Sequence, residues 1–245
     1  MTIKNHIKET LFHFGYIVRH LQPDELGYDA FRDMNRLSGV ESGAILFDVG
    51  ANVGQSIDSF RERFKSPIIH SFEPGPSAFA RLQERTQGVP DLHLNNFALG
   101  AKPEERTFHE NETSVLSSFL AAGRDGAGGN VIAKVAVPVN SIDNYCAHAG
   151  VMHIDVLKSD TQGFDFEVLK GALGMLREHR IHLVFVELMF LESYVGAPRF
   201  EELYAFLKDL GFVLMSFYKQ LRNDSHLGPL AEIDGLFIDP QWRRS

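Results

Sequence analysis

The first forty residues carry apolar positions at the spacing of an α-helix. Apolar side chains recur every three or four residues over 3–21, which places them along one stripe of a helix. Pro23 and Gly27 interrupt this pattern, and a second short helix is predicted over 26–37. We expect the segment 1–40 to form a helical lid or a contact between copies of the chain. A helix that binds a membrane surface or a partner protein is the alternative.

From Ala44 onward the pattern changes to short apolar runs that alternate with helical patterns, which is typical of βαβ units and a parallel sheet. Core strands are predicted over residues 44–49, 68–72, 92–99, 153–157 and 183–188. Helices are predicted around residues 57–64, 77–85, 166–176 and 200–210.

Two further strands, over 212–218 and 233–239, follow each other with no helical pattern between them. Strands joined without a crossover are most simply antiparallel. The fold class is therefore predicted to be α/β, with a Rossmann-like, doubly wound, seven-stranded and mostly parallel sheet. It would end in an antiparallel C-terminal hairpin and carry N-terminal helices in addition. Residues 41–245 are expected to form one domain.

The stretch 101–140 is less regular. A short strand is predicted around 106–109, and the alternating segment 131–139 indicates another. Between them, the run 121–129 contains four glycines. We interpret this run as a mobile loop, and a gate over a binding site is the alternative.

Composition narrows the class of protein. The chain has 245 residues and a formal net charge of −8, which argues against nucleic acid as the partner, because phosphates attract a basic surface. Cys146 is the only cysteine, so an intrachain disulfide is excluded. No apolar run approaches the roughly 20 residues that span a bilayer, so no membrane is expected as a partner. The expected compartment is the cytoplasm.

The strongest candidate for chemistry is the loop that follows the first core strand, where Asp48, Gly50, Asn52, Gly54 and Gln55 lie within eight residues. The first glycine allows a sharp turn and a close approach of the backbone to a ligand. The second opens a helix, whose N-terminal amides favour an anionic group such as a carboxylate. Asp48 would suit an amino group. The loop therefore fits a ligand that carries an amino acid moiety.

The spacing of these glycines lacks the G-x-G-x-x-G pattern that holds the pyrophosphate of a dinucleotide. Glu73 ends the second strand, 25 residues after Asp48, and is followed by Pro74. A carboxylate at this place accepts hydrogen bonds from both hydroxyls of a ribose. Together, the loop and Glu73 favour a nucleoside ligand without phosphates.

The end of the third predicted strand adds a further candidate contact. Asn96 and Ala98 belong to the stretch Asn95–Gly100, where a polar side chain and free backbone amides would read the edge of an adenine. A plain strand end is the alternative. Ser117 and Ser118 would face the amino acid part of the ligand, or lie in a surface turn.

The longest motif runs from Leu157 to Ala172. The fourth strand delivers Asp160 to the carboxyl edge of the sheet, where open α/β folds bind ligands. Gln162 follows in the turn, and Glu187 ends the neighbouring strand. Two carboxylates are therefore expected to point into one crevice.

The glycine loop, Glu73-Pro74, Ala98-Leu99-Gly100, Ser141-Ile142-Asp143 and the motif from Leu157 to Gly171 resemble the FkbM-type S-adenosylmethionine-dependent methyltransferases, which are class I enzymes. The resemblance covers residues 44–239 and implies that S-adenosyl-L-methionine is the cofactor. It also implies O-methylation of a hydroxyl on a natural product or sugar. Family members usually carry Glu where this chain has Gln162, so a role that needs a carboxylate there is in doubt.

From these observations, the expected cofactor-binding residues are Asp48, Gly50, Asn52, Gly54, Gln55, Glu73, Pro74, Asn96, Ala98, Ser118, Asp160 and Gln162. Asp160 and Glu187 are the candidate catalytic residues, since a hydroxyl acceptor must lose a proton. A divalent cation held by both carboxylates is an alternative that we do not favour, and the metal ligands are unknown. Another alternative is that Asp160 binds the cofactor and Glu187 is structural.

Other residues remain open. His109 and His153 are weaker candidates for the base. Lys219, Arg222 and His226 lie between the last two predicted strands and would meet an acidic or sugar acceptor, or form a solvated loop.

Two rival functions remain. The first is an NAD(P)-dependent oxidoreductase on a similar sheet, which the glycine spacing disfavours. The second is a non-catalytic module that binds S-adenosylmethionine and acts on a partner through the N-terminal helices. We expect a small hydroxylated acceptor, whose identity the sequence does not specify.

Overall fold

The computed structural model describes residues 3–16, 22, 24–126, 129–223 and 228–244. Its main feature is a seven-stranded sheet with the order β3-β2-β1-β7-β8-β10-β9. The strands are β1 (Ile45–Val49), β2 (Ile68–Phe72), β3 (Leu92–Asn95), β7 (Ile154–Ser159), β8 (Ile181–Met189), β9 (Val213–Arg222) and β10 (Leu230–Ile238).

The pairing of these strands confirms the predicted fold class. From β3 to β8 all neighbours are parallel, whereas β10 pairs antiparallel with both β8 and β9. The chain first builds the sheet from β1 outward to β3 and then returns to place β7 on the other side of β1. This reversal makes the sheet doubly wound, and it opens a crevice at the carboxyl ends of β1 and β7.

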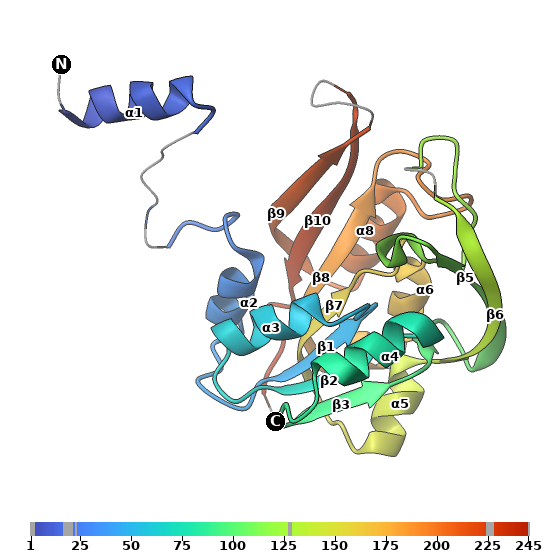
Figure 1. Ribbon diagram of the computed structural model, residues 1–245. Coiled ribbons are helices and arrows are strands. Elements are labelled where there is room, and N and C mark those ends of the chain that lie inside the picture. Colours follow the sequence, from blue (N-terminus) through green and yellow to red (C-terminus); the bar gives the residue numbers. More distant parts are fainter. Residues whose placement is uncertain (1–2, 17–21, 23, 127–128, 224–227, 245) are drawn as a thin grey trace.

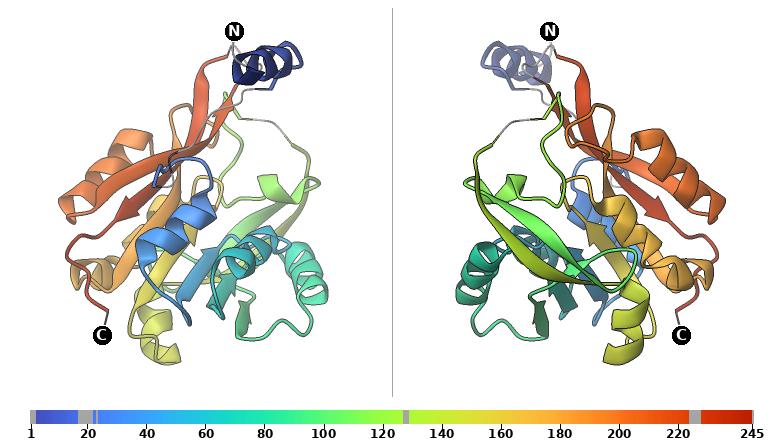
Figure 2. Two further views of the ribbon diagram at one scale, coloured as in Figure 1. Left: turned by 90° about the vertical axis from the view of Figure 1, so that its left-hand side faces the viewer. Right: turned by 90° about the vertical axis from the view of Figure 1, so that its right-hand side faces the viewer.

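Helices cover both faces of the sheet (Figure 2). One hydrophobic cluster packs α2 (Ala30–Ser38), α3 (Gln55–Arg63) and α4 (Pro76–Arg85) against one face. A second cluster packs α5 (Ile142–Ala149), α6 (Asp165–Lys170), α7 (Leu173–Arg177) and α8 (Phe200–Asp209) against the other. β8 is buried along its whole length, because both of its faces are covered.

Helix α2 belongs to this layered body. Its N-cap Asp29 accepts a hydrogen bond from the Arg32 amide, and Gly39 ends it in the left-handed conformation. The fully buried Asp33 accepts hydrogen bonds from the Tyr218 hydroxyl at 2.9 Å and from the Gly27 amide at 2.8 Å. These bonds tie the N-terminal segment to β9.

Helix α1 (Ile3–His13) lies outside the two layers (Figure 1). It confirms a helix at the N-terminus, although the predicted pattern extended to residue 21, and residues 17–21 lie outside the described part of the chain. The side chains of Ile7, Phe12 and Phe14 are exposed. Within the described residues, no helix has the length and apolar character needed to cross a bilayer.

The predicted strand over 92–99 is wrong as a single element. β3 ends at Asn95, and β4 (Ala98–Leu99) joins a separate three-stranded sheet with the order β4-β6-β5. β5 (Glu104–Asn111) and β6 (Val131–Asn140) form its antiparallel pair. The break arises at Asn96, whose side-chain amide donates to the carbonyl oxygens of Glu73 and Pro74 and turns the chain away.

The single helix predicted over 166–176 is also wrong, because α6 and α7 are separated at Gly171. A Cβ at this glycine would overlap the carbonyl oxygen of Gly100, so the chain passes β4 at backbone distance. Helix α5 was not predicted. Its N-cap Ser141 accepts a hydrogen bond from the Asn144 amide, and Gly150 ends it.

The described part of the glycine-rich run is docked, which contradicts its interpretation as a mobile loop. The Gly123 amide donates to the Ser193 carbonyl oxygen at 2.9 Å, and the Val195 amide donates to Ala121 at 2.9 Å. A Cβ at Gly123 would overlap the carbonyl oxygen of Glu192. The glycines are therefore needed because two backbones pack directly against each other.

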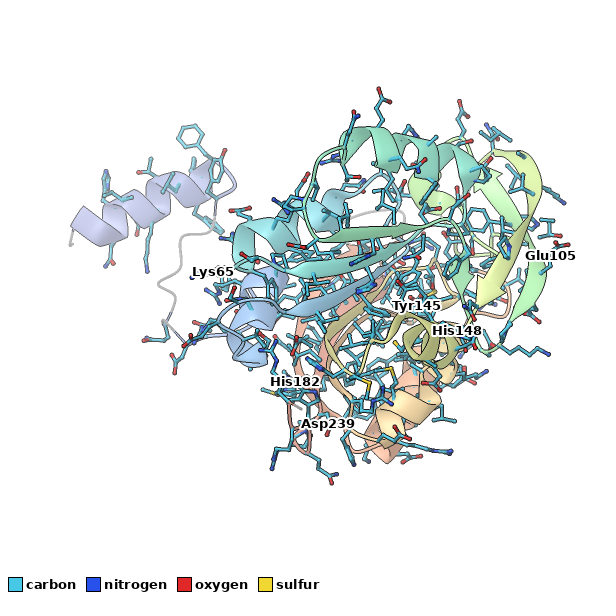
Figure 3. The ribbon with its side chains drawn as sticks, turned by 90° about the horizontal axis from the view of Figure 1, so that it is seen from below. Lys65, Glu105, Tyr145, His148, His182 and Asp239 are labelled. Atoms are coloured by element: carbon cyan, nitrogen blue, oxygen red, sulfur yellow. The ribbon has the colours of Figure 1, made fainter. Side chains whose placement is uncertain are left out.

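The C-terminal segment crosses the amino edge of the sheet, opposite the crevice. The ring of Trp242 stacks on His182 with centroids 4.1 Å apart, and the Asp239 amide donates to the His182 carbonyl oxygen. Figure 3, which views the molecule from below, labels His182 and Asp239 at this edge. Arg244 donates to the carbonyl oxygen of Gly43 at 3.2 Å and fastens the end of the segment.

Candidate active site

The glycine loop meets the fourth-strand motif at the point where the strand order reverses. Gly50 directly follows β1 and has a φ of 79°, a conformation that L side chains rarely adopt. A Cβ at this position would overlap the carbonyl oxygen of Asp160, which follows β7. The Asp160 amide in turn donates to the Val49 carbonyl oxygen at 3.0 Å. The two loops therefore form one continuous wall.

A cavity of about 380 Å³ opens on this wall. Its lining comes from the ends of β1, β2, β4, β7 and β8 and the loops after them, from β5 and the chain between β5 and β6, and from the β9–β10 hairpin. The lining residues are Val49, Gly50, Ala51, Asn52, Gln55, Ser56, Phe72, Glu73, Pro74, Ala98, Leu99, Phe108, Ser114, Val115, Leu116, Ser117, Phe119, Lys158, Asp160, Thr161, Gln162, Phe164, Glu187, Lys219, Leu221 and Glu232.

Glu73 reaches this cavity from the end of β2 and is held by two backbone amides. Its Oε2 accepts from the Asn52 amide at 2.8 Å, and its Oε1 accepts from the Gly75 amide at 2.7 Å. Burial raises the pKa of the Glu73 carboxyl to about 7, although both amides oppose the shift. Each oxygen keeps a second lone pair that can accept a hydrogen bond from a ligand.

The first turn of α3 starts beside this carboxylate. Gly54 is the N-cap with a φ of 93°, and a Cβ there would press on the Leu82 side chain at 2.9 Å. Asn52 has a φ of 47°, which is uncommon for a residue with a side chain. Its buried Oδ1 has no hydrogen-bond partner among the described residues. The loop therefore presents a polar side chain that is ready for a ligand.

Asp48 does not reach the cavity. It is fully buried, and its Oδ1 lies 3.2 Å from Nζ of Lys158 on the neighbouring strand. Burial disfavours the charge of Lys158, but the carboxylates of Asp48 and Asp160 outweigh this effect and raise its pKa above the usual value. Lys158 lines the cavity, so Asp48 borders the cavity lining only through its contact with this lysine.

Asp160 projects from the loop after β7 and is one third exposed. Its Oδ1 accepts a hydrogen bond from Nε2 of Gln162 at 3.0 Å, and its Oδ2 lies 3.9 Å from Lys158 Nζ. The loop is held from behind, since the Asp165 carboxylate accepts from the Ser159 hydroxyl at 2.6 Å and from the Thr161 amide at 3.1 Å. Asp160 is therefore a carboxylate in a fixed place.

Glu187 lies deeper, at the end of β8, and faces the β9–β10 hairpin. It is buried, and its Oε2 has no hydrogen-bond partner among the described residues. Burial, followed by the charges of Asp160 and Glu232, raises the pKa of Glu187 well above its usual value. Asp234 is the register partner of Glu187 on β10, and burial raises its pKa to about 7. This end of the cavity is therefore acidic, and the basic side chain of Lys219 also lines it.

The opposite wall of the cavity is apolar and aromatic. The Phe119 ring lies 5.2 Å from Phe108 and 4.7 Å from Phe164, measured between centroids. All three line the cavity, together with the 3₁₀-helix η1 (Ser114–Leu116). Such a wall suits the flat face of a nucleobase such as adenine.

The structure brings most of the predicted site residues to one cavity. The residues that line it are Gly50, Asn52, Gln55, Glu73, Pro74, Ala98, Asp160, Gln162 and Glu187. Four others do not line it, namely Asp48, Gly54, Asn96 and Ser118. Ser118 donates from its hydroxyl to the Gln162 carbonyl oxygen at 2.8 Å, so it supports the loop from behind.

Sequence reasoning missed several lining residues, namely Lys158, Glu232, Leu221, the η1 residues and the aromatic wall. Lys158 had a signal, because residues two apart on a strand share a face and Asp160 was already a candidate. The others had none, since Phe108, Phe119 and the η1 residues are placed by the three-stranded sheet, and Leu221 and Glu232 by the pairing of β9 with β10. Of the hairpin candidates, Lys219 lines the cavity, Arg222 is exposed and donates to the Gly228 carbonyl oxygen, and His226 lies outside the described residues.

The described residues offer no metal-binding group, and the histidine candidates for the base lie outside this cavity. Among the described residues, no group of three or more His, Cys, Asp and Glu side chains is arranged to hold a metal ion. His109 lines a separate cavity of about 200 Å³, and His153 lies at the amino edge of the sheet, 3.7 Å from Asp155. Neither histidine faces the cavity beside Gly50.

With this geometry in view, comparison with known families is decisive. The model of the methyltransferase FkbM domain matches residues 48–214, which is more than half of the chain. The chain belongs to the FkbM methyltransferase family. The match begins in the glycine loop and extends through Asp160 and Glu187 into β9, so it includes most of the cavity of this FkbM protein.

One protein with a similar sequence is the 2-O-methyltransferase NoeI of Sinorhizobium fredii. It is 24% identical to this FkbM protein over 162 residues, which cover 62% of the chain and 66% of that relative. The alignment therefore spans just under two thirds of the length of the relative.

Solved structures of low sequence identity resemble this chain. A structure described as an rRNA methylase from Streptococcus thermophilus is 12% identical, with a TM-score of 0.48, over 89% of this chain and 99% of that one. A structure from Streptococcus mutans, described as a methyltransferase in complex with SAH, is also 12% identical with a TM-score of 0.48. It covers 87% of this chain and 100% of that one. The fold assignment rests on the strand order of this chain itself.

S-adenosyl-L-methionine is the cofactor of this family, and the cavity fits it. Gly50 lets the first loop pack against the Asp160 loop as one wall of the cavity, and the carboxylate of Glu73 lies beside this loop. Asn52 Oδ1, Thr161 Oγ1 and Glu187 Oε2 are buried without hydrogen-bond partners among the described residues. A bound cofactor or acceptor would supply hydrogen-bond partners for these atoms, because buried polar groups are normally paired.

Proposed function

We propose that this protein is an O-methyltransferase that transfers the methyl group of S-adenosyl-L-methionine to a hydroxyl of a small molecule. The observation that carries the proposal is the shared cavity. It joins the glycine loop and Glu73, which fit the cofactor, to Asp160 and Glu187, which fit the chemistry of a hydroxyl. The name of the relative in Sinorhizobium fredii, a 2-O-methyltransferase, supports oxygen as the acceptor atom.

The cofactor would be held by the residues that the sequence nominated and by those that support them. Gly50, Asn52 and Gln55 would contact its amino acid part, at the N-terminus of α3. Glu73 would accept from the ribose hydroxyls, and Pro74 and Ala98 would border the adenine. Asp48, Gly54, Asn96 and Ser118 would act from outside the lining, by fixing Lys158 and the three loops.

The cofactor supplies a methyl group on a sulfonium and leaves as S-adenosylhomocysteine. In the proposed reaction the oxygen–methyl bond forms as the sulfur–methyl bond breaks. Asp160 takes the proton of the hydroxyl, and the sulfonium charge is neutralised. Alignment of the two reactants supplies roughly 7–11 kcal/mol, and a positioned base adds about 10²–10⁴-fold.

Glu187 takes the second role at this end of the cavity. Burial and neighbouring carboxylates raise its pKa, so its carboxyl group is suited to a hydrogen bond with the acceptor hydroxyl. If Asp160 only binds the cofactor, Glu187 becomes the base instead. Single variants of the two residues distinguish these assignments.

We further propose that residues 41–245 form the methyltransferase domain together with α2, and that the part of the segment 1–40 before α2 is a lid or an oligomer contact. Helix α2 is anchored to β9 through Asp33, which leaves α1 as the part of the segment that lies outside the layers (Figure 1). The net charge of −8 supports a small-molecule acceptor over a nucleic acid.

The test is release of S-adenosylhomocysteine from S-adenosylmethionine in the presence of a panel of hydroxylated small molecules, with sugars included. The proposal expects release that depends on an acceptor and that falls at least about 10²-fold in Asp160→Asn. Asp209→Asn, at an exposed position of α8 outside the cavity lining, is the control for the same change of side chain. Acceptor-independent release, or full turnover in both Asp160→Asn and Glu187→Gln, would contradict it.

A further inference from the structure

Gln162 joins Asp160 to a tyrosine that no sequence motif singled out. The amide of Gln162 donates from Nε2 to Asp160 Oδ1 at 3.0 Å. On its other side, Oε1 of Gln162 accepts from the hydroxyl of Tyr194 at 2.6 Å. The three side chains form a continuous row of hydrogen bonds from the protein interior to the cavity.

The direction of this row is fixed by the donors and acceptors available. An ionised carboxylate only accepts, so the nitrogen of the amide must face Asp160 and the oxygen must face Tyr194. Tyr194 then has to donate. Burial and the surrounding carboxylates raise the pKa of Tyr194 above its usual value, so its hydroxyl keeps its proton. In each bond of the row, one side chain is the donor and its neighbour is the acceptor.

Both ends of the bridge are held rigidly. Gln162 has a φ of 53°, and its carbonyl oxygen accepts from the buried Ser118 hydroxyl at 2.8 Å. Tyr194 is only 7% exposed and lies in the segment that pairs with the glycine-rich run. The position of Tyr194 is therefore set by the docked backbones around Gly123 and Ser193.

We propose that Gln162 and Tyr194 are positioning residues that hold the Asp160 carboxylate in the orientation needed to meet the acceptor hydroxyl. This inference rests on the proposed function, in which Asp160 is the base. It assigns a role to Tyr194 and explains why an amide stands at residue 162. The Gln162 amide accepts from the tyrosine and at the same time donates to the carboxylate, which an ionised carboxylate at this place cannot do.

An ionised carboxyl at residue 162 would lose the bond to Asp160, because it has no proton to donate. It would place a second acidic group about 3 Å from Asp160, and like charges at this distance disfavour each other. The introduced carboxyl would keep its proton to a higher pH than in the unfolded chain, where the pKa of a glutamate is about 4.3. Its favourable contact is present at low pH and is lost as the pH rises.

The kinetic experiment compares Tyr194→Phe with Tyr204→Phe, whose ring packs on Phe200 in α8 and does not line the cavity. We expect kcat to fall roughly tenfold in Tyr194→Phe, with KM for S-adenosylmethionine nearly unchanged, because orientation of the base is lost and cofactor contacts remain. Tyr204→Phe should leave kcat within about twofold.

A double-mutant cycle then shows whether Tyr194 acts through Asp160. In Asp160→Asn the orientation of the carboxylate no longer matters, so adding Tyr194→Phe should cause no further loss of kcat. Additive losses of kcat would overturn the proposal. So would a Tyr194→Phe variant that raises KM for the cofactor and leaves kcat unchanged, because Gln162 would then serve cofactor binding.

The second experiment needs no acceptor. As the pH rises from about 4 to 7, the melting temperature of Gln162→Glu should fall further and further below that of the wild type. The reason is that the introduced carboxyl loses its proton and then repels the Asp160 carboxylate. Gln83→Glu, at an exposed position of α4, should show a difference that does not change with pH. If the difference in melting temperature between Gln162→Glu and the wild type does not change with pH, residue 162 does not contact Asp160 and the proposal is wrong. If no acceptor is turned over by the wild type, the proposed function fails, but this comparison still decides the contact.

Discussion

At the scale of single residues, the site depends on backbone conformations that most side chains avoid. Gly50, Asn52 and Gln162 all have positive φ, at 79°, 47° and 53°, in two loops that face each other where the strand order reverses. Such conformations persist only where the surroundings enforce them, and they occur often at functional sites. Here the enforcement is mutual, because each loop leaves room for the other.

Replacement of Gly50 by alanine tests this mutual fit. Gly88 is a matched control, because its φ of 80° is nearly the same and a Cβ there would meet nothing within 4 Å. We expect Gly88→Ala to cost about 1 kcal/mol of unfolding free energy, from the backbone alone. Gly50→Ala should cost at least about 2 kcal/mol more, because a Cβ would overlap the Asp160 carbonyl oxygen. Urea unfolding measures both values, and equal costs would refute the close approach.

The raised pKa of Glu73 gives a prediction about pH. Its pKa of about 7 in the folded protein lies above the ordinary value of 4.5, so its contribution to stability is present below pH 4.5 and is lost as the pH rises through 7. Without cofactor, the wild type should therefore lose on the order of 3 kcal/mol between pH 5 and 8 relative to Glu73→Gln.

The measurement is urea unfolding of both proteins at several pH values. Glu73→Gln also gives up one backbone hydrogen bond, which costs about 1 kcal/mol at every pH. That offset does not depend on pH and can be subtracted. A difference between the two proteins that stays constant from pH 5 to 8 would show that Glu73 is not buried as described.

Residues with local signals were predictable from the sequence, and residues placed by distant contacts were not. Gly50 and Glu73 stand directly after apolar runs, so their place at the carboxyl edge follows from the pattern alone. Asp48 was expected at the ligand, but its carboxylate is turned towards Lys158 on β7. That pairing depends on strand register, which the pattern does not specify.

At the scale of elements, the described part of the glycine-rich run is a packed structure. The glycine-rich run pairs with the segment that follows β8, through bonds between Gly123 and Ser193 and between Ala121 and Val195. Since Tyr194 belongs to this segment, packing of the run determines where its hydroxyl lies. A run that the sequence pattern indicated to be a mobile loop therefore sets the position of the Tyr194 side chain.

Gly123→Ala should loosen this packing. The introduced Cβ would overlap the carbonyl oxygen of Glu192, so the two backbones must separate. Arg124 follows directly and is well exposed, which makes it a cleavage site for trypsin. We expect cleavage after Arg124 to become roughly tenfold faster in the variant, as the population of the open loop rises. Cleavage after the exposed Lys65 is the internal control, and an unchanged ratio of the two rates would contradict the docking.

The order and type of the main elements could be predicted because apolar runs and helical stripes alternate clearly. The errors fall where a tertiary contact ends an element. Asn96 separates β3 from β4 by bonding to the backbone at Glu73 and Pro74, and Gly171 separates α6 from α7 where the chain passes Gly100. Neither contact has a signature in the local pattern.

At the scale of the whole molecule, the sheet separates two ends with different tasks. The cavity lies at the carboxyl ends of the strands, and the C-terminal segment covers the amino edge through Trp242 and Arg244. Because the fold places β7 beside β1, motifs about 110 residues apart in the chain become neighbours. The place of the cavity at the carboxyl ends of the strands follows from the topology of a doubly wound sheet.

Trp242 is the only tryptophan, so its fluorescence reports on this edge alone. If the C-terminal segment is an integral part of the domain, the fluorescence of Trp242 and the far-UV circular dichroism should change at the same urea concentration. Loss of the fluorescence signal at a lower concentration would mean that the segment detaches before the sheet unfolds.

The central claim is that the cavity beside Gly50 and Glu73 binds S-adenosylmethionine. Calorimetric titration of S-adenosylhomocysteine into the wild type, Glu73→Gln and the exposed control Glu84→Gln tests it most directly. The account predicts one site per chain, affinity at least about tenfold weaker in Glu73→Gln, and wild-type affinity in Glu84→Gln. No heat from well-folded wild type, or equal affinity in the two variants, would contradict it.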